Sequence, residues 1–156
     1  MWNLFKQTKR NKIVSPVKGK VIDLSLVNDN AFASKAMGEG FAIEPTGNTF
    51  LSPISGTVTV VFPTGHALGI VNDDIELIIH IGIDTVKLQG DGFHIFVQQG
   101  DTIHQGDRIA EVNIQKIKEN GFDVTTMVVC TNGHVPKVMK KWNQDIKEGE
   151  EIAIID

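Results

Sequence analysis

Cysteine, tyrosine and long apolar runs are scarce or absent in this sequence. Its 156 residues include one cysteine, Cys130, and no tyrosine. A single cysteine excludes an intrachain disulfide framework, and because Cys130 lies in an apolar run we expect a buried, inert thiol. No run of about 18 or more apolar residues occurs, so no membrane-spanning helix is predicted. These features favour a protein of a reducing compartment, the cytoplasm.

Positive charge is not in excess either. The 15 lysines and arginines are outnumbered by 19 aspartates and glutamates, which gives a formal net charge of -4. Nucleic-acid binding depends on clustered cations, and neither such a cluster nor a zinc-finger spacing is present, so we expect no nucleic-acid partner. The hydrophobic fraction of 41% is that of a globular chain, and 156 residues suffice for one domain with a single core.

The chain starts with MWNLFKQTKRNK, which lacks the apolar segment of a secretory signal. We expect residues 1–12 to form a flexible tail and residues 13–156 to form the domain. The aromatic residues of the tail lie beside lysines and an arginine. They offer at most a weak contact with anionic lipid.

Helical periodicity is almost absent, whereas short Val/Ile-rich runs alternate with Gly, Pro, Asn and Asp. This pattern is typical of many short strands. Only NIQKIKENG, residues 113–121, predicts a helix, which Gly121 would end. We therefore expect an all-β protein, an antiparallel β-sandwich or barrel with at most short peripheral helices.

Two pairs of similar segments indicate an internal duplication. SPVKGKV (15–21) is similar to SPISGTV (52–58), and DTIHQGDRIAEV (101–112) is similar to QDIKEGEEIAII (144–155). Each segment contains a glycine at a place where a strand would bend or turn tightly. The sequence therefore predicts a sandwich or barrel built from two related halves.

The segment ELIIHIGID, residues 76–84, predicts a buried strand that contains a histidine. Side chains alternate between the two faces of a strand. The core face would carry Leu77, Ile79, Ile81 and Ile83. His80 would point to the other face, and its plainest interpretation is a histidine satisfied by a neighbouring group.

A second histidine, His66, lies upstream in TGHALGIV, residues 64–71. If residues 72–74 (NDD) form a three-residue loop, the two runs make a hairpin with His66 directly opposite His80 on one face. A two-residue loop would shift the register by one and separate the histidines onto opposite faces. The pairing therefore depends on the loop length.

Two opposed imidazoles suit either a zinc site or a phosphohistidine relay, because both use a neutral ring nitrogen beside a second donor or ligand. Asp84 is the one nearby candidate for a third zinc ligand. Since no His-x-His pair or cysteine cluster completes the set, we expect no intrinsic catalytic zinc site. The remaining histidines lack such partners and are expected in solvated loops. They are His94, His104 and His134.

HALGI together with ELIIHIGIDTVKLQGDGF resembles the glucose-type EIIA component (PTS EIIA type-1 domain) of the bacterial phosphoenolpyruvate-dependent sugar phosphotransferase system. The resemblance continues through SPVKGKV, FASKAMGEGFAIEPTGN, LSPISGTV and EEIAIID, and so covers nearly everything after the first dozen residues. It implies a β-sandwich or barrel of the duplicated hybrid-motif type, and no required cofactor.

The resemblance also implies a phosphotransferase role. His80 would accept a phosphoryl group on Nε2 from the phosphocarrier protein HPr and pass it to a cysteine on the IIB domain of a sugar permease. His66 would stabilise the phosphoryl group, Thr64 would orient His66, and the Gly82 carbonyl would orient His80. A zinc ion shared between the two histidines and a partner's carboxylate would also fit this family. We expect a monomer, and the sequence leaves a regulatory role that depends on phosphorylation open.

A docking face for protein partners is implied as well. Asp29 and Asp84 match acidic family positions that meet basic residues of HPr. An apolar patch around them would exclude water from a labile phosphoimidazole. Its positions are Phe32, Phe62, Ile78 and Val86. Lys87 departs from the family, since an acidic residue is expected there, and partner affinity would differ accordingly.

A lipoyl or biotinyl carrier domain is the binding-module alternative, because such domains share the G-x-V bends, and Lys35 in SKAM would be the modified residue. A carrier needs its lysine at an exposed hairpin tip and only about half this length. It also leaves His66 and His80 unexplained.

Overall fold

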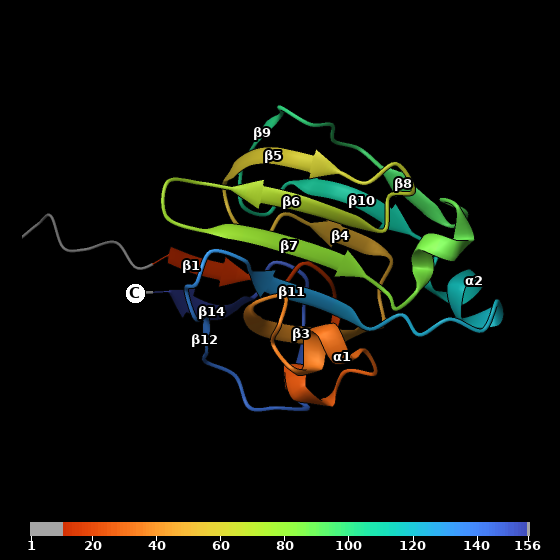
Figure 1. Cartoon of the computed structure of the whole chain (residues 1–156), viewed down its shortest axis with the longest axis horizontal. Helices are drawn as coiled ribbons and strands as arrows, with labels where there is room; N and C mark the ends of the chain where they lie inside the picture. The colour runs from red at the N-terminus through yellow and green to blue at the C-terminus, as the bar shows by residue number, and fades with distance from the viewer. Residues whose placement is uncertain (1–10, 156) are drawn as a thin grey trace, which may run out of the picture.

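The computed structural model describes residues 11–155, and most of their regular structure is β-strand. The largest sheet has eight antiparallel strands in the order β13-β2-β3-β11-β7-β6-β5-β9. In that order the strands are Asp145–Ile146, Gly19–Ile22, Glu39–Pro45, Thr126–Cys130, Glu76–Ile81, Ala67–Val71, Gly56–Val61 and Thr102–Ile103. Figure 1 shows the central strands of this sheet side by side.

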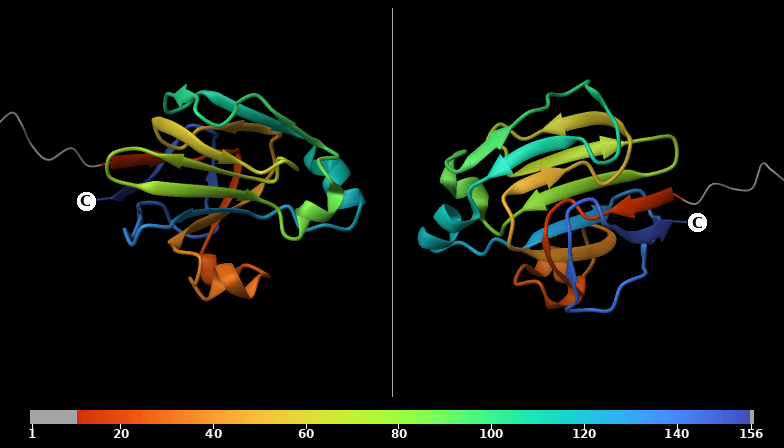
Figure 2. Two further views of the ribbon diagram at one scale, coloured as in Figure 1. Left: turned by 45° about the horizontal axis from the view of Figure 1, so that its top comes forward. Right: turned by 180° about the vertical axis from the view of Figure 1, so that it is seen from behind.

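Two smaller antiparallel sheets pack behind the large one, as the right panel of Figure 2 shows. One is β1-β14-β12, formed by Asn11–Val14, Glu151–Ile155 and Lys137–Val138. The other is β4-β10-β8, formed by Thr49–Leu51, Arg108–Val112 and Phe93–Ile95. The prediction of an all-β antiparallel sandwich is therefore confirmed.

Helices are short and lie at the periphery, as expected. They are η2 (Leu24–Leu26), α1 (Asn30–Ala33), η3 (Thr85–Leu88) and α2 (Ile114–Glu119). The predicted helix is α2, in which the Asn113 side chain accepts from the Lys116 N–H at 3.0 Å and caps the first turn. Gly121 follows the helix with a left-handed φ of 86°. Among residues 11–155, no helix has the length and hydropathy needed to cross a bilayer.

The predicted tail, residues 1–12, falls mostly outside the described residues, which start at residue 11. Its last two residues belong to β1, where Asn11 pairs with Ile155 and Lys12 with Ile154. Residues 11 and 12 are therefore part of a sheet, although they fall within the predicted tail. The strand partner, β14, lies at the other end of the chain and is not adjacent in sequence, so local composition could not reveal this pairing.

The predicted duplication is visible in matching hydrogen bonds. The buried Ser15 hydroxyl donates to the Val17 carbonyl at 2.8 Å, and the buried Ser52 hydroxyl donates to the Ile54 carbonyl at 2.6 Å. The Ser15 carbonyl accepts from Gly149, and the Ser52 carbonyl accepts from Gly106, each at 2.9 Å. The two similar sequence pairs therefore fold into the same pair of interlocked turns.

The strand order of the large sheet shows the same duplication. Read from either end, it pairs β13 with β9, β2 with β5, β3 with β6 and β11 with β7. The middle of the sheet is the boundary between β11 and β7, where Met127 lies opposite His80. The histidine strand is therefore one of the two strands at the centre.

Apolar side chains form two clusters, one on each face of the central strands. Leu77, Ile79 and Ile81 of β7 lie in the larger cluster between the sheets, as predicted. Ile83 does not, because Gly82 has a φ of 83° that interrupts the alternation, and Ile83 lies in the smaller cluster instead. That smaller cluster lies on the His80 side and is covered by η2 and α1, which Figure 1 shows beneath β3 and β11.

Cys130 is buried in the larger cluster, as expected of an inert thiol. Its Sγ donates to the Asn132 side-chain oxygen at 2.9 Å.

Candidate functional site

The histidine hairpin forms, but with a different register from the one predicted. Ala67 of β6, not His66, lies opposite His80, and Val71 pairs with Glu76. The Asn72 N–H donates to the Ile75 carbonyl at 3.0 Å, so the turn closes around residues 73 and 74, as in the two-residue alternative. The Asn72 side chain also accepts from the N–H groups of Asp74 and Ile75, at 2.9 and 3.0 Å. The predicted three-residue loop is therefore wrong, and in a regular strand His66 would point to the core face.

His66 reaches His80 nevertheless, because it lies just outside the regular strand. Gly65 before it has a left-handed φ of 73°, which turns the chain before β6 begins at Ala67. The His66 carbonyl still accepts from the Ile81 N–H at 2.7 Å. The centroids of the two imidazole rings lie 5.1 Å apart with an interplanar angle of 76°. The two histidines are therefore adjacent as predicted, but through the turn at Gly65 and not through the predicted strand register.

His80 is partly buried at the centre of the large sheet, flanked by Ala67 of β6 and Met127 of β11. Its Nδ1 lies 2.8 Å from the carbonyl oxygen of Gly82. A carbonyl can only accept, so Nδ1 carries the proton, and Nε2 is left with a free electron pair. The contact predicted between Gly82 and the ring is therefore present.

His66 is almost fully buried, and its Nδ1 lies 2.5 Å from the hydroxyl of Thr64. A hydroxyl can donate or accept, so this contact permits either tautomer. Among the hydrogen bonds of residues 11–155, none involves Nε2 of His66 or of His80. Both rings are thus held through Nδ1 and leave Nε2 available.

Two phenylalanines extend the pair into a row of four rings. Phe32 of α1 lies 5.1 Å from His80, centroid to centroid, and Phe62 lies 5.3 Å from His66. The interplanar angles are 58° and 71°, so both contacts are tilted or edge-on, as aromatic pairs prefer. The phenylalanine rings pack against the outer sides of the two imidazoles and shield them from water.

Burial is the main influence on both imidazoles. It lowers the pKa of His66, and the neighbouring His80 lowers it further. It also lowers the pKa of His80, although the Gly82 carbonyl and the charges of Asp29 and Asp84 act in the opposite direction. Since the ordinary histidine pKa is about 6.5, both rings are neutral at pH 7. A neutral ring is the form that has a nucleophilic nitrogen.

The charges of the predicted acidic residues raise the pKa of His80, against the larger effect of burial. Asp29 caps α1 by accepting from the Ala31 N–H at 3.0 Å. Asp84 is exposed, precedes η3 and has a left-handed φ of 60°. Asp29 therefore precedes the helix that carries Phe32, and Asp84 follows the strand that carries His80.

Two of the four predicted apolar docking positions are exposed: Phe62 at 41% and Val86 at 49%. Ile78 is partly buried against the smaller cluster. Phe32 differs from the prediction, because it is only 4% exposed: its ring fills the space between α1 and His80. Leu26 and Met37 are further exposed apolar residues, one before and one after α1 in the chain, that were not singled out from the sequence.

Within residues 11–155, no three His, Cys, Asp or Glu side chains come together in a way that could hold a metal ion. Asp84 therefore does not join the two histidines as a third ligand. Of the other histidines, His94 is exposed but lies in β8 rather than in a loop.

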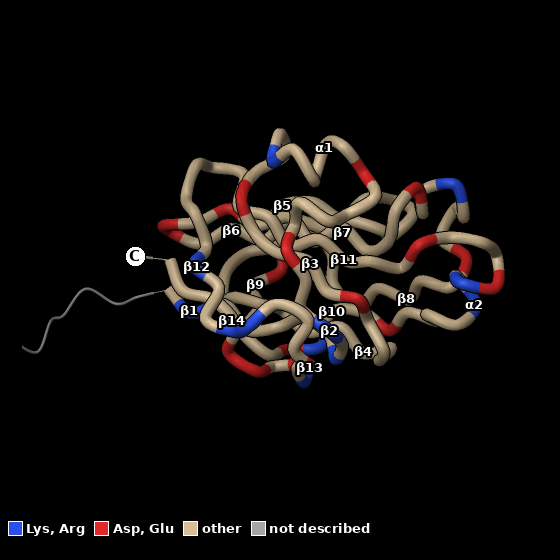
Figure 3. Tube along the Cα trace, turned by 90° about the horizontal axis from the view of Figure 1, so that it is seen from below, with Lys and Arg blue, Asp and Glu red and all other residues tan. Residues whose placement is uncertain are grey.

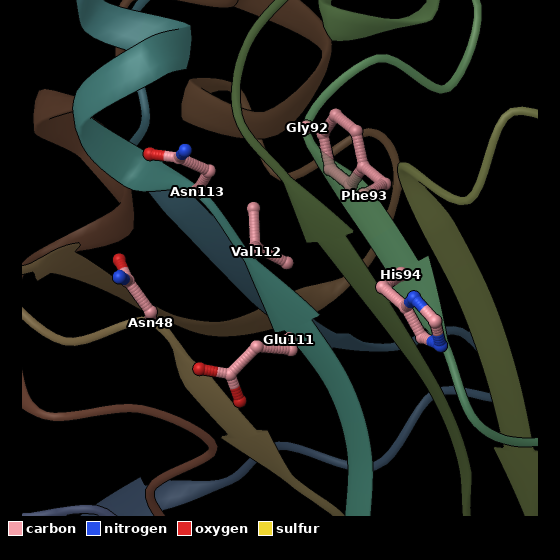
Figure 4. Close-up of a pocket in the computed structure, with 7 residues that line it drawn as sticks. All are labelled: Asn48, Gly92, Phe93, His94, Glu111, Val112 and Asn113. Atoms are coloured by element: carbon pink, nitrogen blue, oxygen red, sulfur yellow. The ribbon is translucent and has the colours of Figure 1, made fainter.

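A separate pocket of about 410 Å³ lies at the surface of the β4-β10-β8 sheet and does not include the histidine pair. Figure 4 shows its residues, which are Asn48, Gly92, Phe93, His94, Glu111, Val112 and Asn113. Asn48 and Asn113 accept from backbone N–H groups at the start of α2. Their amides are therefore explained by the structure of that helix.

Lys35 does not occupy a hairpin tip. It follows α1 with a left-handed φ of 66°, and its Nζ lies 3.3 Å from the Glu39 carboxylate. The geometry that a lipoyl or biotinyl carrier requires of its lysine is therefore not found there.

Comparisons with known proteins show which family the chain belongs to. The family model of the phosphoenolpyruvate-dependent sugar phosphotransferase system, EIIA 1, matches residues 11–135. The PTS system beta-glucoside-specific EIIBCA component of Halalkalibacterium halodurans is 49% identical over 125 residues, which are 80% of this chain and 20% of that protein. This chain therefore spans about a fifth of that relative.

Other relatives match over most of their length. The PTS system glucose-specific EIIA component of Staphylococcus aureus is 37% identical over 145 residues, covering 92% of this chain and 87% of that protein. The solved structure of glucose permease IIA from Mycoplasma capricolum superposes with a TM-score of 0.87 at 34% identity, covering 94% of this chain and 96% of that one. The chain therefore belongs to the EIIA 1 family of the phosphoenolpyruvate-dependent sugar phosphotransferase system, as a glucose-type EIIA domain.

Proposed function

We propose that this chain is a phosphoryl carrier in sugar uptake, in which His80 takes a phosphoryl group from HPr and gives it to a cysteine of a IIB domain. The observation that carries the proposal is the pair of adjacent, neutral imidazoles, each held through Nδ1 with Nε2 left without a protein partner among residues 11–155. The EIIB and EIIC parts that relatives carry in the same chain support a IIB partner.

We assign His80 as the acceptor because the Gly82 carbonyl favours the tautomer with the proton on Nδ1. With Nδ1–H donating to the Gly82 carbonyl, the Nε2 electron pair attacks phosphorus while the bond from phosphorus to the donor's histidine nitrogen breaks. The Nδ1 proton stays on the ring, and no electron is transferred. In the second step the cysteine thiolate attacks the same phosphorus, and the Nε2–phosphorus bond breaks.

His66 stabilises the transferring group. For this role its Nε2 must carry a proton, so the Thr64 hydroxyl donates to Nδ1. The Nε2–H then donates to the phosphoryl oxygens, where negative charge gathers in a loose, in-line transition state. The short distance between the rings places this donor beside the reacting nitrogen.

The surface around the pair suits a basic, partly apolar partner. Asp29 and Asp84 supply negative charge, and the exposed Phe62 and Val86 supply apolar area. Figure 3 shows several lysine and arginine stretches around β1, β2, β13 and β14, on the side of that view opposite α1, and single ones beside α1 and near α2. Basic residues of HPr would therefore meet attraction at the site, which speeds encounter.

The same two Nε2 atoms could hold a zinc ion only as part of a shared site. Structural zinc has four ligands, and residues 11–155 bring together no third ligand group here. A partner's carboxylate would have to complete the site, so zinc would strengthen an assembly and is not required for the transfer.

The test is transfer of labelled phosphate from phosphoenolpyruvate through enzyme I and HPr to this chain. The natural sequence should gain an acid-labile, alkali-stable label that is lost in His80→Gln. His66→Gln should still be labelled but should fail to pass the label to a IIB domain, and Thr64→Val should be impaired in the same step. His94→Gln, which changes an exposed histidine outside the pair, is the matched control and should behave as the natural sequence.

Absence of label on the natural sequence, with an HPr that phosphorylates another EIIA domain, would overturn the proposal. Label that survives in His80→Gln would overturn the assignment of the acceptor. In either case, stoichiometric zinc binding by the natural sequence and its loss in His66→Gln would be the next measurement.

A further inference from the structure

The carbonyl that holds the His80 ring is itself held by a loop from another part of the chain. The Gly82 carbonyl and the Ile83 N–H belong to one peptide group. The carbonyl accepts from His80 Nδ1 at 2.8 Å, and the N–H donates to the backbone oxygen of Asp123 at 2.9 Å. A peptide group that donates at one end becomes a stronger acceptor at the other. The Asp123 backbone therefore sets the direction of the Gly82 carbonyl and makes it a stronger acceptor for His80 Nδ1–H.

The peptide on the other side of Gly82 is anchored to the same loop. Its N–H donates to the Thr125 carbonyl at 3.0 Å. Gly82 has a φ of 83°, and a Cβ there would lie 2.3 Å from Thr85 Cγ2 and 3.0 Å from the Asp123 carbonyl. With both flanking peptides bound and no room for a side chain, the direction of the Gly82 carbonyl follows the position of residues 123–125.

The Asp123 side chain sets the shape of that loop. One carboxylate oxygen accepts from both the backbone N–H and the hydroxyl of Thr125, at 2.8 and 2.6 Å. Residues 122–125 lie outside any helix or strand, so these side-chain bonds take the place of a strand ladder. Hydrogen bonds to a carboxylate are stronger than those between neutral groups. A single side chain therefore fixes the two backbone oxygens that hold Gly82.

We propose that Asp123 is a positioning residue for His80: its carboxylate holds the loop that fixes the Gly82–Ile83 peptide, and through that peptide the Nδ1–H tautomer of the ring. The tautomer is a property of the free protein and does not depend on any partner. Its consequence for phosphoryl transfer rests on the proposed function, because it is the Nε2 electron pair that attacks phosphorus.

The direct test is the ¹⁵N spectrum of the His80 ring, measured by long-range ¹H–¹⁵N correlation well above pH 7. In the natural sequence the shifts should show a proton predominantly on Nδ1. In Asp123→Ala the Nε2–H form should gain population, and the rate of phosphorylation by HPr should fall by about tenfold, since small displacements of a reacting group carry large rate penalties. Asp123→Asn keeps the accepting oxygen and should restore most of both properties.

Two further variants separate positioning from general damage to the fold. Thr125→Val removes only the hydroxyl bond and should produce a smaller change in the same direction. Asp101→Ala removes a loop carboxylate that accepts from the Gln98 N–H at 2.9 Å and is the matched control. It should leave the His80 shifts and the phosphorylation rate unchanged.

Native ring shifts in folded Asp123→Ala and Thr125→Val would overturn the positioning role, even if the natural sequence is phosphorylated. An Nε2–H ring in the natural sequence would overturn it as well. Altered shifts in Asp123→Ala, in a protein that never takes up label, would uphold the positioning role and overturn the proposed function instead. The two failures are therefore distinguishable.

Discussion

The imidazole rings of His66 and His80 meet edge to face, with centroids 5.1 Å apart, although the two residues are not directly paired in the sheet. Their closeness depends on the left-handed Gly65, which turns the chain just before His66, so that the regular strand β6 begins only at Ala67. Each ring is held at Nδ1 by a different kind of group, a hydroxyl for His66 and a carbonyl for His80. The arrangement provides one ring with a free electron pair beside another that is able to donate.

The titrations of the two rings should be coupled. His80 lowers the pKa of His66, in addition to the larger effect of burial. Glutamine has a similar size and no charge, so His80→Gln should raise the pKa of His66 while leaving it below about 6.5. Following the ring resonances of His66 against pH in both proteins measures this. An unchanged midpoint would show that the rings do not interact electrostatically.

Stability should fall on mild acidification. Burial lowers the pKa of both histidines in the folded state, so below about pH 6.5 the unfolded chain binds protons that the folded chain does not. The stability contributed by the neutral pair is therefore complete above that pH and declines as the pH falls towards the folded-state pKa values. Urea unfolding between about pH 7.5 and pH 5 should show this loss. The double variant His66→Gln, His80→Gln should show a shallower slope, and an equal slope would contradict the prediction.

Alanine at Gly82 should destabilise the protein by about 2–4 kcal/mol, from the positive φ and the overlap with Thr85 Cγ2 together. Thr85→Ser removes that methyl group and keeps a hydroxyl able to donate to the Ile81 carbonyl. The double variant Gly82→Ala, Thr85→Ser should therefore recover part of the loss, as measured by urea unfolding. If the double variant is no more stable than Gly82→Ala, the methyl contact is not the cause.

Val86 should matter for docking and not for folding. It is 49% exposed and two residues from Asp84, so a lysine in its place would set a positive charge against a basic, partly apolar partner and remove the apolar contact. Val86→Lys should reduce kcat/KM for phosphorylation by HPr by about tenfold, with little change in unfolding free energy. Val135→Lys alters an exposed valine that is not among the docking positions, and it should leave kcat/KM unchanged. Equal effects of the two variants would argue against a specific docking role.

The sequence predicts the fold class, the duplication and the short helix, because these depend on local composition and repeated patterns. The contacts of Thr64 with His66 and of Gly82 with His80 were implied by the family resemblance and not by the residue pattern, which made the meeting of the histidines depend on the loop length. The register was wrong because Asn72 and Ile75 close the turn around two residues, through a backbone bond and the Asn72 side chain, and turn composition does not reveal such bonds. Only the three-dimensional structure shows how Gly65 restores the contact.

Other features depend on contacts between distant segments. Phe32 lies in a short segment with polar residues nearby, so a surface position was expected for it. It is buried because α1 lies over His80. Asp123 gives no signal either, because its carboxylate bonds only within its own loop, and the backbone hydrogen bonds that join this loop to Gly82 and Ile83 leave no residue pattern. Ile83 follows neither strand periodicity nor turn composition, since the conformation of the preceding glycine moves it.

The reversible strand order of the large sheet means that the molecule has approximate two-fold symmetry at the level of architecture, with its axis between β11 and β7. The two central strands differ at this boundary, because His80 lies in β7 and the residue facing it in β11 is Met127. The turns that build the scaffold are kept in both halves, with Ser15 and Ser52 making the same bonds. The two halves therefore share their scaffold, whereas the imidazole at the centre belongs to one half alone, and under the proposed function this gives a partner a single ring to approach.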